Sequence, residues 1–492
     1  MTDAALESVF SLLRSGAGNL AAYLAAHVLL CLLPAFLVAG AMTALIPKEI
    51  ITRFLGRDCP KAISYPAAAA GGFLLAVCSC TVIPLFAGIY KKGAGLGPAI
   101  AFLFVAPAVN ILALVYTGKM LGVDLAIARG VLSVVFGVGI GLLMALIFRG
   151  DDVEHDQATT RMFSGQGSMR GSTVSLLSLL VALLIVGTLQ LDMLMHAYAQ
   201  VQIPTTSIHH FQDFLAELVP HDTSKGEEGV TAQGAILIGL LVLIGLAAWR
   251  GIECIFERFS AWTWVFVSLV GVTLMFASLQ IVPTSKGVTL HFTGKFIGVS
   301  IITAALGWVL KTRLASDELR DFLWESWRFV KQIFPLLIIG VFIVGVIREL
   351  VQPQWVQSLA GENTVGGNFV GVVFGVFMYF PTLVEVPIAQ MFLDLGMHRG
   401  PLLAYLLADP ELSFQSILIT ASVIGKKKAW VYVGLVAVFS TLAGMLYGTW
   451  IDGSSLWSVT SYLLAVLGGI VAILWVVGRR QVRHSKPNTT SS

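Results

Sequence analysis

Two cysteines separated by a single residue, Cys78 and Cys80, lie within an apolar stretch that prolines interrupt. Residues 75–110 read LAVCSCTVIPLFAGIYKKGAGLGPAIAFLFVAPAVN. Two thiols at an irregular turn can converge on one ion, and thiolates select soft species such as Cu(I), Zn(II) and thiophilic metalloids. The alternative is that both cysteines are small apolar fillers, as free cysteine often is. We predict that Cys78 and Cys80 bind a soft metalloid.

Neutral side chains near the helix breaks extend the predicted substrate-binding set. Thr81 follows the cysteines, Pro84 interrupts the same segment, and Asn110 ends the next one. Thr382 and Ser413 lie at corresponding places in the second half of the chain. We predict that these five residues surround the substrate together with the two cysteines.

Three carboxylates lie in apolar surroundings in the C-terminal half of the chain: Glu385, Asp409 and Glu411. A charged side chain at the bilayer centre costs about 2.5–3.5 kcal/mol on insertion scales, so an intramembrane carboxylate indicates a functional site. We predict that the three residues couple transport to protons, with Glu385 as the first choice. The alternative is that Asp409 or Glu411 caps a half-helix after Pro410.

The composition is that of a polytopic membrane protein. Of the 492 residues, 57% are hydrophobic and 12% are charged, whereas soluble domains average about 25% charged residues. The opening residues MTDAALESVFSLLRSG lack a small-residue cleavage pattern, so we expect the first helix to be retained. The expected partners are the lipid bilayer and a small-molecule or metalloid substrate. No nucleic acid and no cofactor is expected.

Apolar runs of roughly 17–28 residues, each long enough to cross about 30 Å of hydrocarbon, recur along the chain. They lie near 19–46, 65–90, 97–117, 125–148, 173–198, 234–249, 261–283, 292–311, 330–351, 365–392, 400–421, 429–449 and 457–477. Polar stretches at 149–172, 199–233 and 312–329 divide them into groups.

An internal repeat appears when the chain is compared with itself at an offset of 303 positions. Three prolines and three glycines then coincide, namely Pro84, Pro98 and Pro107 with Pro387, Pro401 and Pro410, and Gly72, Gly93 and Gly97 with Gly375, Gly396 and Gly400. At ordinary proline usage, three proline matches arise roughly once in ten thousand per offset. The match therefore indicates two related units.

The distribution of Lys and Arg predicts the topology. If the proline-interrupted segments 65–90 and 365–392 each enter and return on the same side, 23 of the 31 basic residues share one side of the membrane. That side is then the cytoplasm. The N-terminus lies outside, the C-terminus lies in the cytoplasm, and 199–233 faces the exterior. The two units run in opposite directions, as in many secondary transporters.

The predicted fold is an all-α polytopic membrane protein with an inverted-topology repeat, two re-entrant or broken hairpin segments and about 11 spanning helices. Four regions follow from it. They are an N-terminal transport repeat (1–148), a four-helix insert with an exterior loop (149–327), a C-terminal transport repeat (328–449), and a last helix with a cytoplasmic tail (450–492).

The stretch CSCTVIPLFAGIYKKGAGLGPAIAFLFVAPAVNILAL resembles the predicted-permease family that includes the bacterial organoarsenical efflux permease ArsP. The Cys-x-Cys-Thr-x-Ile-Pro motif, the Gly-rich turn, the Ala-Pro-Ala-Val-Asn end and the duplicated proline spacing around 387–410 carry the resemblance. It implies an inner-membrane permease and, for arsenic-linked members, export of trivalent and often methylated arsenicals through membrane cysteines. The insert at about 150–327 departs from many shorter members.

Three functions compete at this point. The leading hypothesis is a proton-coupled efflux permease for trivalent arsenicals or a related thiophilic metalloid. The second is a transporter of another small solute or anion, in which the cysteines are incidental. The third is an intramembrane thiol oxidoreductase, for which the chain lacks a Cys-x-x-Cys motif. We favour a transporter, not an enzyme, because no His-Glu-x-x-His or Gly-x-Ser-x-Gly motif occurs either.

Overall fold

Helices dominate the computed structural model. It describes residues 3–26, 28–75, 79–162, 170–188, 192–204, 207–219, 229–253, 255–256, 260–284, 287–350, 353–377, 385–455, 457, 461–462, 464–465 and 468–469. Within these ranges seven helices are long and apolar enough to cross a membrane, or up to ten if each of three bent pairs forms one span. The predicted all-α polytopic class is confirmed. Most of the expected last span, 457–477, lies outside the described residues.

The first unit begins with a bent N-terminal arm and continues into short and long helices. Its elements are α1 (Asp3–Ala26), the π-helix η1 (Val28–Leu32), α2 (Leu33–Leu45), α3 (Lys48–Leu55), α4 (Lys61–Leu75), α5 (Ser79–Lys91), α6 (Leu96–Ala108), α7 (Ile111–Met120), α8 (Val123–Ile147) and α9 (Arg149–Met162). The single span expected over 19–46 is thus divided between α1, η1 and α2.

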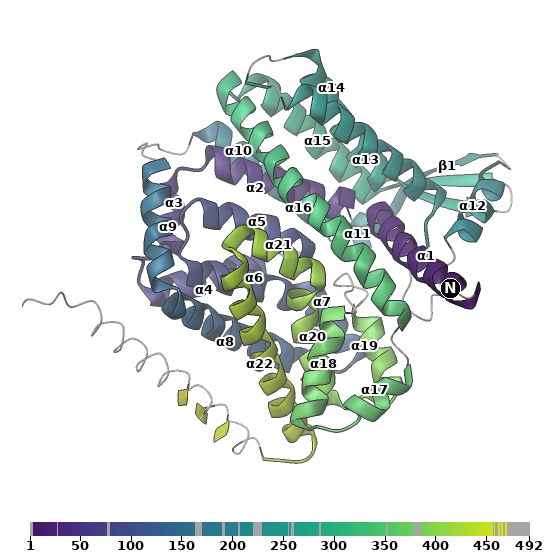
Figure 1. Cartoon of the computed structure of the whole chain (residues 1–492). Coiled ribbons are helices and arrows are strands. Elements are labelled where there is room, and N and C mark those ends of the chain that lie inside the picture. Colours follow the sequence, from purple (N-terminus) through teal and green to yellow (C-terminus); the bar gives the residue numbers. More distant parts are fainter. Residues whose placement is uncertain are drawn as a thin grey trace, which may run out of the picture.

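The insert combines four long helices with a small sheet. Its elements are α10 (Gly171–Thr188), α11 (Asp192–Met195), β1 (Ala197–Ile203), α12 (Ser207–Leu218), α13 (Ala232–Gly251), α14 (Ala261–Ser278), β2 (Gln280–Thr284), β3 (Gly287–Thr293) and α15 (Gly294–Thr312). Figure 1 shows α13, α14 and α15 together at the top, with β1 and α12 to the right.

The antiparallel sheet has the order β1-β3-β2, with Ala197 opposite Thr293 and Thr284 opposite Gly287. The stretch 199–233, predicted as an exterior loop, contains most of β1 and all of α12 in its described part. The side of the membrane that it faces stays a prediction. The hydropathy pattern did not reveal β2 and β3, because these strands directly adjoin apolar helices. Hydropathy summed over a window as long as a membrane span does not separate a short strand from the helix beside it.

The elements of the second unit are α16 (Ser316–Leu350), α17 (Pro353–Ala360), α18 (Val365–Phe377), α19 (Glu385–Asp394), α20 (Arg399–Leu412), α21 (Phe414–Ile424) and α22 (Lys426–Ile451). Figure 1 shows α17 to α20 at the bottom, with α21 higher up, beside α5. At the offset of 303, α4 to α8 correspond to α18 to α22. The paired helices begin within one residue of one another, except that α5 and α19 differ by three.

Equivalent glycines make equivalent close contacts in the two units. A Cβ atom on Gly141 of α8 would lie 2.5 Å from the carbonyl oxygen of Gly97 in α6. A Cβ atom on Gly444 of α22 would lie 2.6 Å from the carbonyl oxygen of Gly400 in α20. Both positions therefore require glycine, because small residues let helix backbones approach closely. The packing of α6 on α8 recurs as the packing of α20 on α22.

Each proline-interrupted segment returns to the end from which it starts. The backbone N–H of Gly95, after α5, donates to the carbonyl oxygen of Leu55, before α4, over 2.8 Å. The N–H of His398, after α19, donates to the carbonyl oxygen of Ala360, before α18, over 2.9 Å. These bonds join the two ends of the segments 61–91 and 365–394, as expected for re-entrant hairpins.

The two units have opposite directions. At one end Tyr447, near the end of α22, donates to Asp124 at the start of α8 over 2.7 Å. At mid-length Phe136 and Phe439 meet with ring centroids 5.1 Å apart. At the other end Lys428, near the start of α22, forms a 3.3 Å ion pair with Asp151, just after α8. Equivalent helices that run antiparallel are the signature of an inverted repeat.

We expect cysteines introduced at Ala62 and Lys427 to react with a membrane-impermeant maleimide only from the cytoplasm. Cysteines at Lys119 and Ser454 should react only from outside, because α7 and α22 end at the opposite end of the bundle. All four residues are exposed. The measurement is labelling of intact cells against everted vesicles, in a variant whose native cysteines are replaced by serine. Labelling of Ala62→Cys and Lys427→Cys from different sides would contradict the inverted arrangement.

Candidate functional site

Both units contain a break after their most buried helix. The helices α6 and α7 meet at 43°, and α20 and α21 meet at 46°. Asn110 and Ser413 lie at these breaks and are buried. Ser413 caps α21, since its Oγ accepts from the N–H of Ser416 over 3.3 Å. The cap is therefore Ser413 rather than Asp409 or Glu411, and the helix continues through Pro410 before it breaks.

The structure places only part of the predicted thiol site. Cys78 and Thr382 lie outside the described residues. Cys80 belongs to the first turn of α5, and its side chain also lies outside what the structure describes. Thr81 and Pro84 follow in α5, and both are buried. The binding roles of these residues stay predictions.

A buried ion pair joins the two units. Glu385, the first residue of α19, pairs with the guanidinium of Arg129 in the first third of α8. Both side chains are shielded from solvent, with exposed fractions of 1% and 0%. Removing one partner of a buried pair costs about 3–5 kcal/mol, because the other charge stays buried and uncompensated. The second hairpin is thus tied to a long helix of the first unit.

The guanidinium of Arg129 also forms hydrogen bonds with both helices that flank the break between α6 and α7. Its Nε donates to the carbonyl oxygen of Ala108 at the end of α6 over 3.2 Å, and its Nη1 donates to Thr117 Oγ1 of α7 over 3.3 Å. The hydroxyl of Ser133 donates to the backbone oxygen of Arg129 over 2.5 Å. Arg129 therefore connects four helices at one point.

Arg129 is absent from the predicted site, which consists of thiols, carboxylates and neutral side chains. The signal was present, because Arg129 is the one charged residue between 125 and 147. An ionisable residue within a spanning segment indicates a functional site whatever its sign. Its pairing with Glu385, 256 positions away, was not readable from the sequence.

Two further carboxyl groups lie in α20 close to this pair. Asp409 is fully buried, and its carboxyl group acts electrostatically on Glu385. Glu411 is 4% exposed and accepts a 2.5 Å hydrogen bond from the hydroxyl of Tyr432 in α22. Its other oxygen, Oε1, has no hydrogen-bond partner within the described part of the chain.

The repeat relates these contacts to one another. Arg129 is equivalent to Tyr432, and Ala108 is equivalent to Glu411, at the offset of 303. Arg129 donates to the backbone oxygen of Ala108, whereas Tyr432 donates to the side chain of Glu411. The same position thus holds a permanent cation in one unit and a neutral phenol in the other. The charge distribution of the site is asymmetric although the backbone is duplicated.

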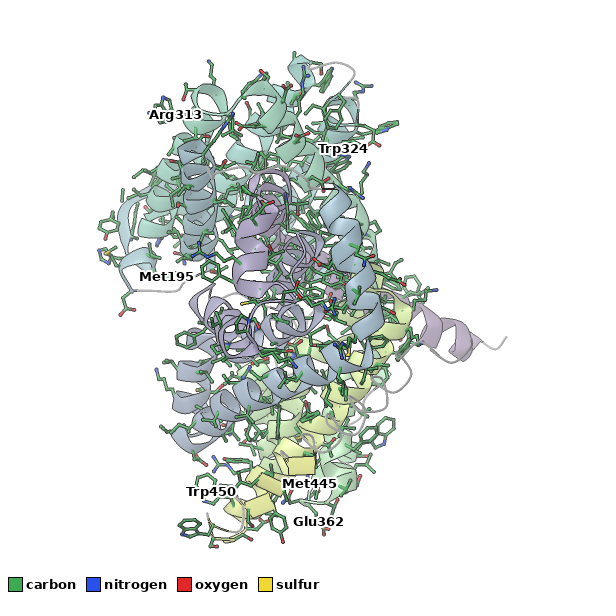
Figure 2. All side chains as sticks on the ribbon, turned by 90° about the vertical axis from the view of Figure 1, so that its left-hand side faces the viewer. Met195, Arg313, Trp324, Glu362, Met445 and Trp450 are labelled. Atoms are coloured by element: carbon green, nitrogen blue, oxygen red, sulfur yellow. The ribbon has the colours of Figure 1, made fainter. Side chains whose placement is uncertain are left out.

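A polar cluster joins the units at the end where α7 and α22 stop. Arg399 Nη1 donates to Asp124 Oδ2 over 2.8 Å, its Nη2 donates to the carbonyl oxygen of Leu121, and Tyr447 donates to the same carboxylate oxygen. Figure 2 shows Glu362, Met445 and Trp450 at this end. The groups link the start of α8 to the start of α20 and the end of α22.

At the opposite end α9 fixes the turn between α5 and α6. Asp152 Oδ1 accepts from the N–H of Leu96 over 2.9 Å at the start of α6. His155 Nε2 bonds the carbonyl oxygen of Tyr90 over 2.8 Å, and the two rings stack with centroids 4.1 Å apart. Burial raises the pKa of Asp152 and lowers the pKa of His155. The thiol hairpin is thus held by groups whose charges depend on pH.

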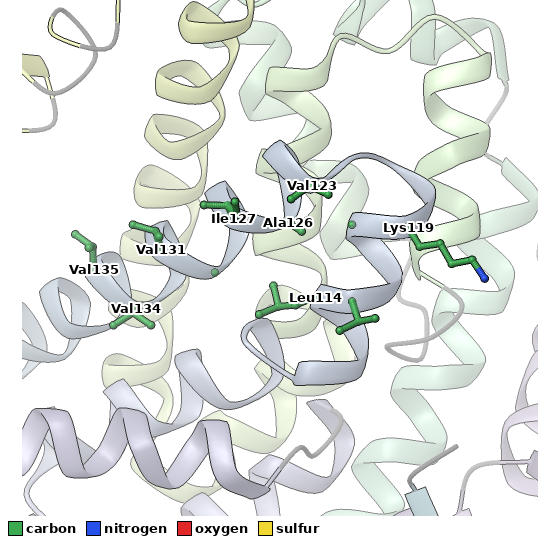
Figure 3. A pocket seen from close by; sticks show the side chains of 11 residues that line it. Leu114, Lys119, Val123, Ala126, Ile127, Val131, Val134 and Val135 are labelled. Carbon is green, nitrogen blue, oxygen red and sulfur yellow. The ribbon is translucent and has the colours of Figure 1, made fainter. Parts of the chain in front are cut away.

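Two cavities lie away from these groups. A groove of about 880 Å³ runs between α7 and α8, and Figure 3 shows Leu114, Val123, Ile127 and Val131 along it, with Lys119 at one side. Its apolar, exposed lining is that of a lipid-facing surface. A smaller cavity of about 230 Å³ lies among apolar residues of α10, α14, α15 and α16. Neither contains a predicted site residue. Among the residues that the structure describes, no cluster of three or more metal-ligating side chains occurs.

Apolar helices, a duplicated unit with antiparallel counterparts and buried charges at the helix breaks define a multi-pass membrane protein of the transporter class. Residues 15–449 match the ArsP_1 family, described as predicted permease, and the chain belongs to this family. The resemblance seen in the sequence is therefore confirmed.

Two relatives share parts of the chain. UPF0718 protein MJ0584 of Methanocaldococcus jannaschii is 32% identical over 426 residues, which cover 87% of this chain and 93% of that protein. UPF0718 protein YraQ of Escherichia coli K12 is 28% identical over 120 residues, 24% of this chain and 34% of that protein. No solved structure matches the chain. Together with the family match, these similarities indicate a transporter rather than an enzyme.

We expect the stability of the purified protein to fall as the pH drops below about 6.5, the ordinary pKa of histidine. The lowered pKa of His155 means that the unfolded chain binds a proton more readily than the folded protein. His155→Phe keeps the stacking on Tyr90 but loses a hydrogen bond worth about 1 kcal/mol. Its melting temperature should be lower at pH 8 and less dependent on pH down to 5.5.

The matched control is His210→Phe on α12, where the histidine is exposed. This variant should keep the pH dependence of the parent protein. Equal pH dependence of the melting temperature in His155→Phe and the parent would exclude His155 as its source.

Proposed function

We propose that this permease exports trivalent organoarsenicals, or a related thiophilic metalloid, across the bacterial inner membrane in exchange for protons. The family supports a permease. The thiols of Cys78 and Cys80, on either side of the start of α5, supply ligands of the right softness. The buried carboxyl groups of α19 and α20 supply proton-binding groups.

The observation that carries the proposal is the ion pair between Glu385 and Arg129. It joins the re-entrant hairpin of one repeat to the long helix of the other, beside the break between α6 and α7. In inverted-repeat transporters the substrate and coupling-ion sites lie at such an interface near the bilayer midplane. Irregular backbone at this depth is tolerated where it is buried in protein or lines a wet cavity.

In the proposed orientation the N-terminus faces the outside and the C-terminus faces the cytoplasm. The end of the bundle that carries Asp152 and Lys428 is then cytoplasmic. Lys91, Lys92 and Arg149 lie at the same end, as the positive-inside rule requires. The cluster of Arg399 and Asp124 faces the outside.

The proposed cycle assigns different tasks to the two repeats. The thiols of the first hairpin bind the substrate from the cytoplasm, with Thr81, Pro84 and Asn110 around it. Thr382 and Ser413 approach from the second repeat. Glu385 takes up a proton from the outside and releases it to the cytoplasm while the substrate moves outward. Asp409 and Glu411 provide the neighbouring proton sites. A neutral substrate is thus driven out by the proton gradient.

We expect Cys78→Ser and Cys80→Ser each to abolish resistance to a trivalent methylated arsenical in an efflux-deficient bacterium. A hydroxyl is a hard ligand and does not replace a thiolate on a soft centre. The matched controls Cys31→Ser and Cys254→Ser should keep resistance, because neither residue belongs to the Cys-x-Cys motif. The measurement is growth over a panel of arsenicals and antimonials. Full resistance in the Cys78/Cys80 double variant would refute the soft-ligand role.

We expect Glu385→Gln to bind the substrate but to show no transport driven by a pH gradient in everted vesicles. Glutamine keeps the shape of the side chain while it fixes the neutral form. Glu385→Asp retains a titratable group and should keep part of the transport. Because Glu385→Gln leaves Arg129 uncompensated, assembly is checked by size-exclusion chromatography. Transport by Glu385→Gln with the proton dependence of the parent would remove Glu385 as the carrier.

A further inference from the structure

Arg129 is among the largest side chains that the structure buries completely. A guanidinium stays protonated inside proteins, so its charge does not change during a transport cycle. Every change of charge around it must therefore occur on the carboxyl groups that face it. The position of Arg129 decides which carboxyl groups those are.

The ionisable groups around Glu385 come from a few elements. Arg129 of α8 and Asp409 of α20 act on it directly. Glu411 of α20 instead binds Tyr432 of α22. From α7, which also packs on α19, Tyr116 is half-buried and Lys119 is exposed. The cluster around Glu385 thus contains one fixed cation and two carboxyl groups.

Glu385 and Asp409 are both fully buried, and Arg129 supplies the one fixed cation of the cluster. Two neighbouring buried carboxylates repel each other, so they share a proton rather than both ionising. One proton on Glu385 and Asp409, with Arg129 beside them, gives a cluster of zero net charge. A second proton gives a net charge of +1. It also removes the Coulomb attraction that holds α19 on α8.

We propose that Arg129 is the positioning residue of proton coupling, the fixed countercharge for a proton shared by Glu385 and Asp409, so that uptake of a second proton releases α19 from α8. The inference rests on the proposed proton-coupled function and specifies how the proton acts. Arg129 does not touch the substrate in this scheme. It converts protonation of the second hairpin into movement.

The repeat explains why only one hairpin responds to protons. Val82 is equivalent to Glu385, and Tyr432 is equivalent to Arg129. The corresponding positions in α5 and α22 therefore carry no charge at neutral pH. The first hairpin, α4 and α5, thus has no titrating pair at the position that corresponds to Glu385 and Arg129, whereas protonation at that pair releases the second hairpin, α18 and α19. Substrate binding and proton coupling are thus separated between the two repeats.

The test measures the accessibility of α19 without any substrate. Ile388 of α19 is 3% exposed, and its repeat equivalent Leu85 of α5 is 1% exposed. Each is replaced by cysteine in the full-length chain, with the native cysteines changed to serine. Labelling by N-ethylmaleimide in membranes is followed between pH 8.5 and 5.5. The ratio of the two rates cancels the common pH dependence of thiol reactivity.

We expect the ratio of Ile388→Cys to Leu85→Cys labelling to rise several-fold as the pH falls. Arg129→Lys keeps the cation and should keep a pH dependence with a shifted midpoint. Arg129→Met combined with Glu385→Gln removes both charges, so no uncompensated charge prevents assembly. This double variant should show a ratio that does not change with pH. The control Lys119→Met removes an exposed cation of α7 and should behave as the parent.

A ratio independent of pH in the parent would overturn the proposal. So would a double variant with the pH dependence of the parent, because Arg129 would then be a packing residue only. The outcome is separate from the proposed substrate, since no arsenical is present. If the cysteine variants keep arsenical resistance but the labelling ratio changes with pH as expected, the role of Arg129 stands without the proposed substrate. If the cysteine variants lose resistance but the labelling ratio does not change with pH, the proposed substrate stands without this role of Arg129.

Discussion

The buried ion pair of Arg129 and Glu385 is the interaction on which the arrangement of the two repeats depends. A guanidinium in an apolar interior needs an anion and satisfied donors, since an unpaired buried charge is very costly. Arg129 meets this demand with Glu385 from the other repeat and with Ala108 and Thr117 from its own. The requirements of a single side chain thereby fix α6, α7, α8 and α19 relative to one another.

Polar side chains stabilise the helix breaks of both repeats. A chain that ends a helix inside the membrane exposes backbone groups that no water can satisfy. The carbonyl oxygen of Ala108 accepts a hydrogen bond from Arg129, and the N–H of Ser416 donates one to the hydroxyl of Ser413. The two repeats thus solve the same backbone problem with different side chains. This difference gives the site its charge asymmetry.

Both ends of the bundle carry polar links between segments that are distant in the sequence. Asp124, Arg399 and Tyr447 connect the repeats at one end, and Lys428 with Asp151 connects them at the other. Alternating access in an inverted repeat requires that such links open and close in turn around a central site. The close approaches of Gly97 to Gly141 and of Gly400 to Gly444 pack two helices tightly within each unit.

The sequence by itself determined the membrane class, the duplication at an offset of 303 and the family, because composition, periodic proline and glycine, and a local motif are properties of the linear chain. It also singled out Glu385, Asp409 and Glu411, since a carboxylate in an apolar run is conspicuous. Only the tertiary structure decided that Glu385 faces Arg129 while Glu411 faces Tyr432. These partners are set by how α8, α19, α20 and α22 cross. Such contacts between distant residues depend on three-dimensional packing, which no local pattern encodes.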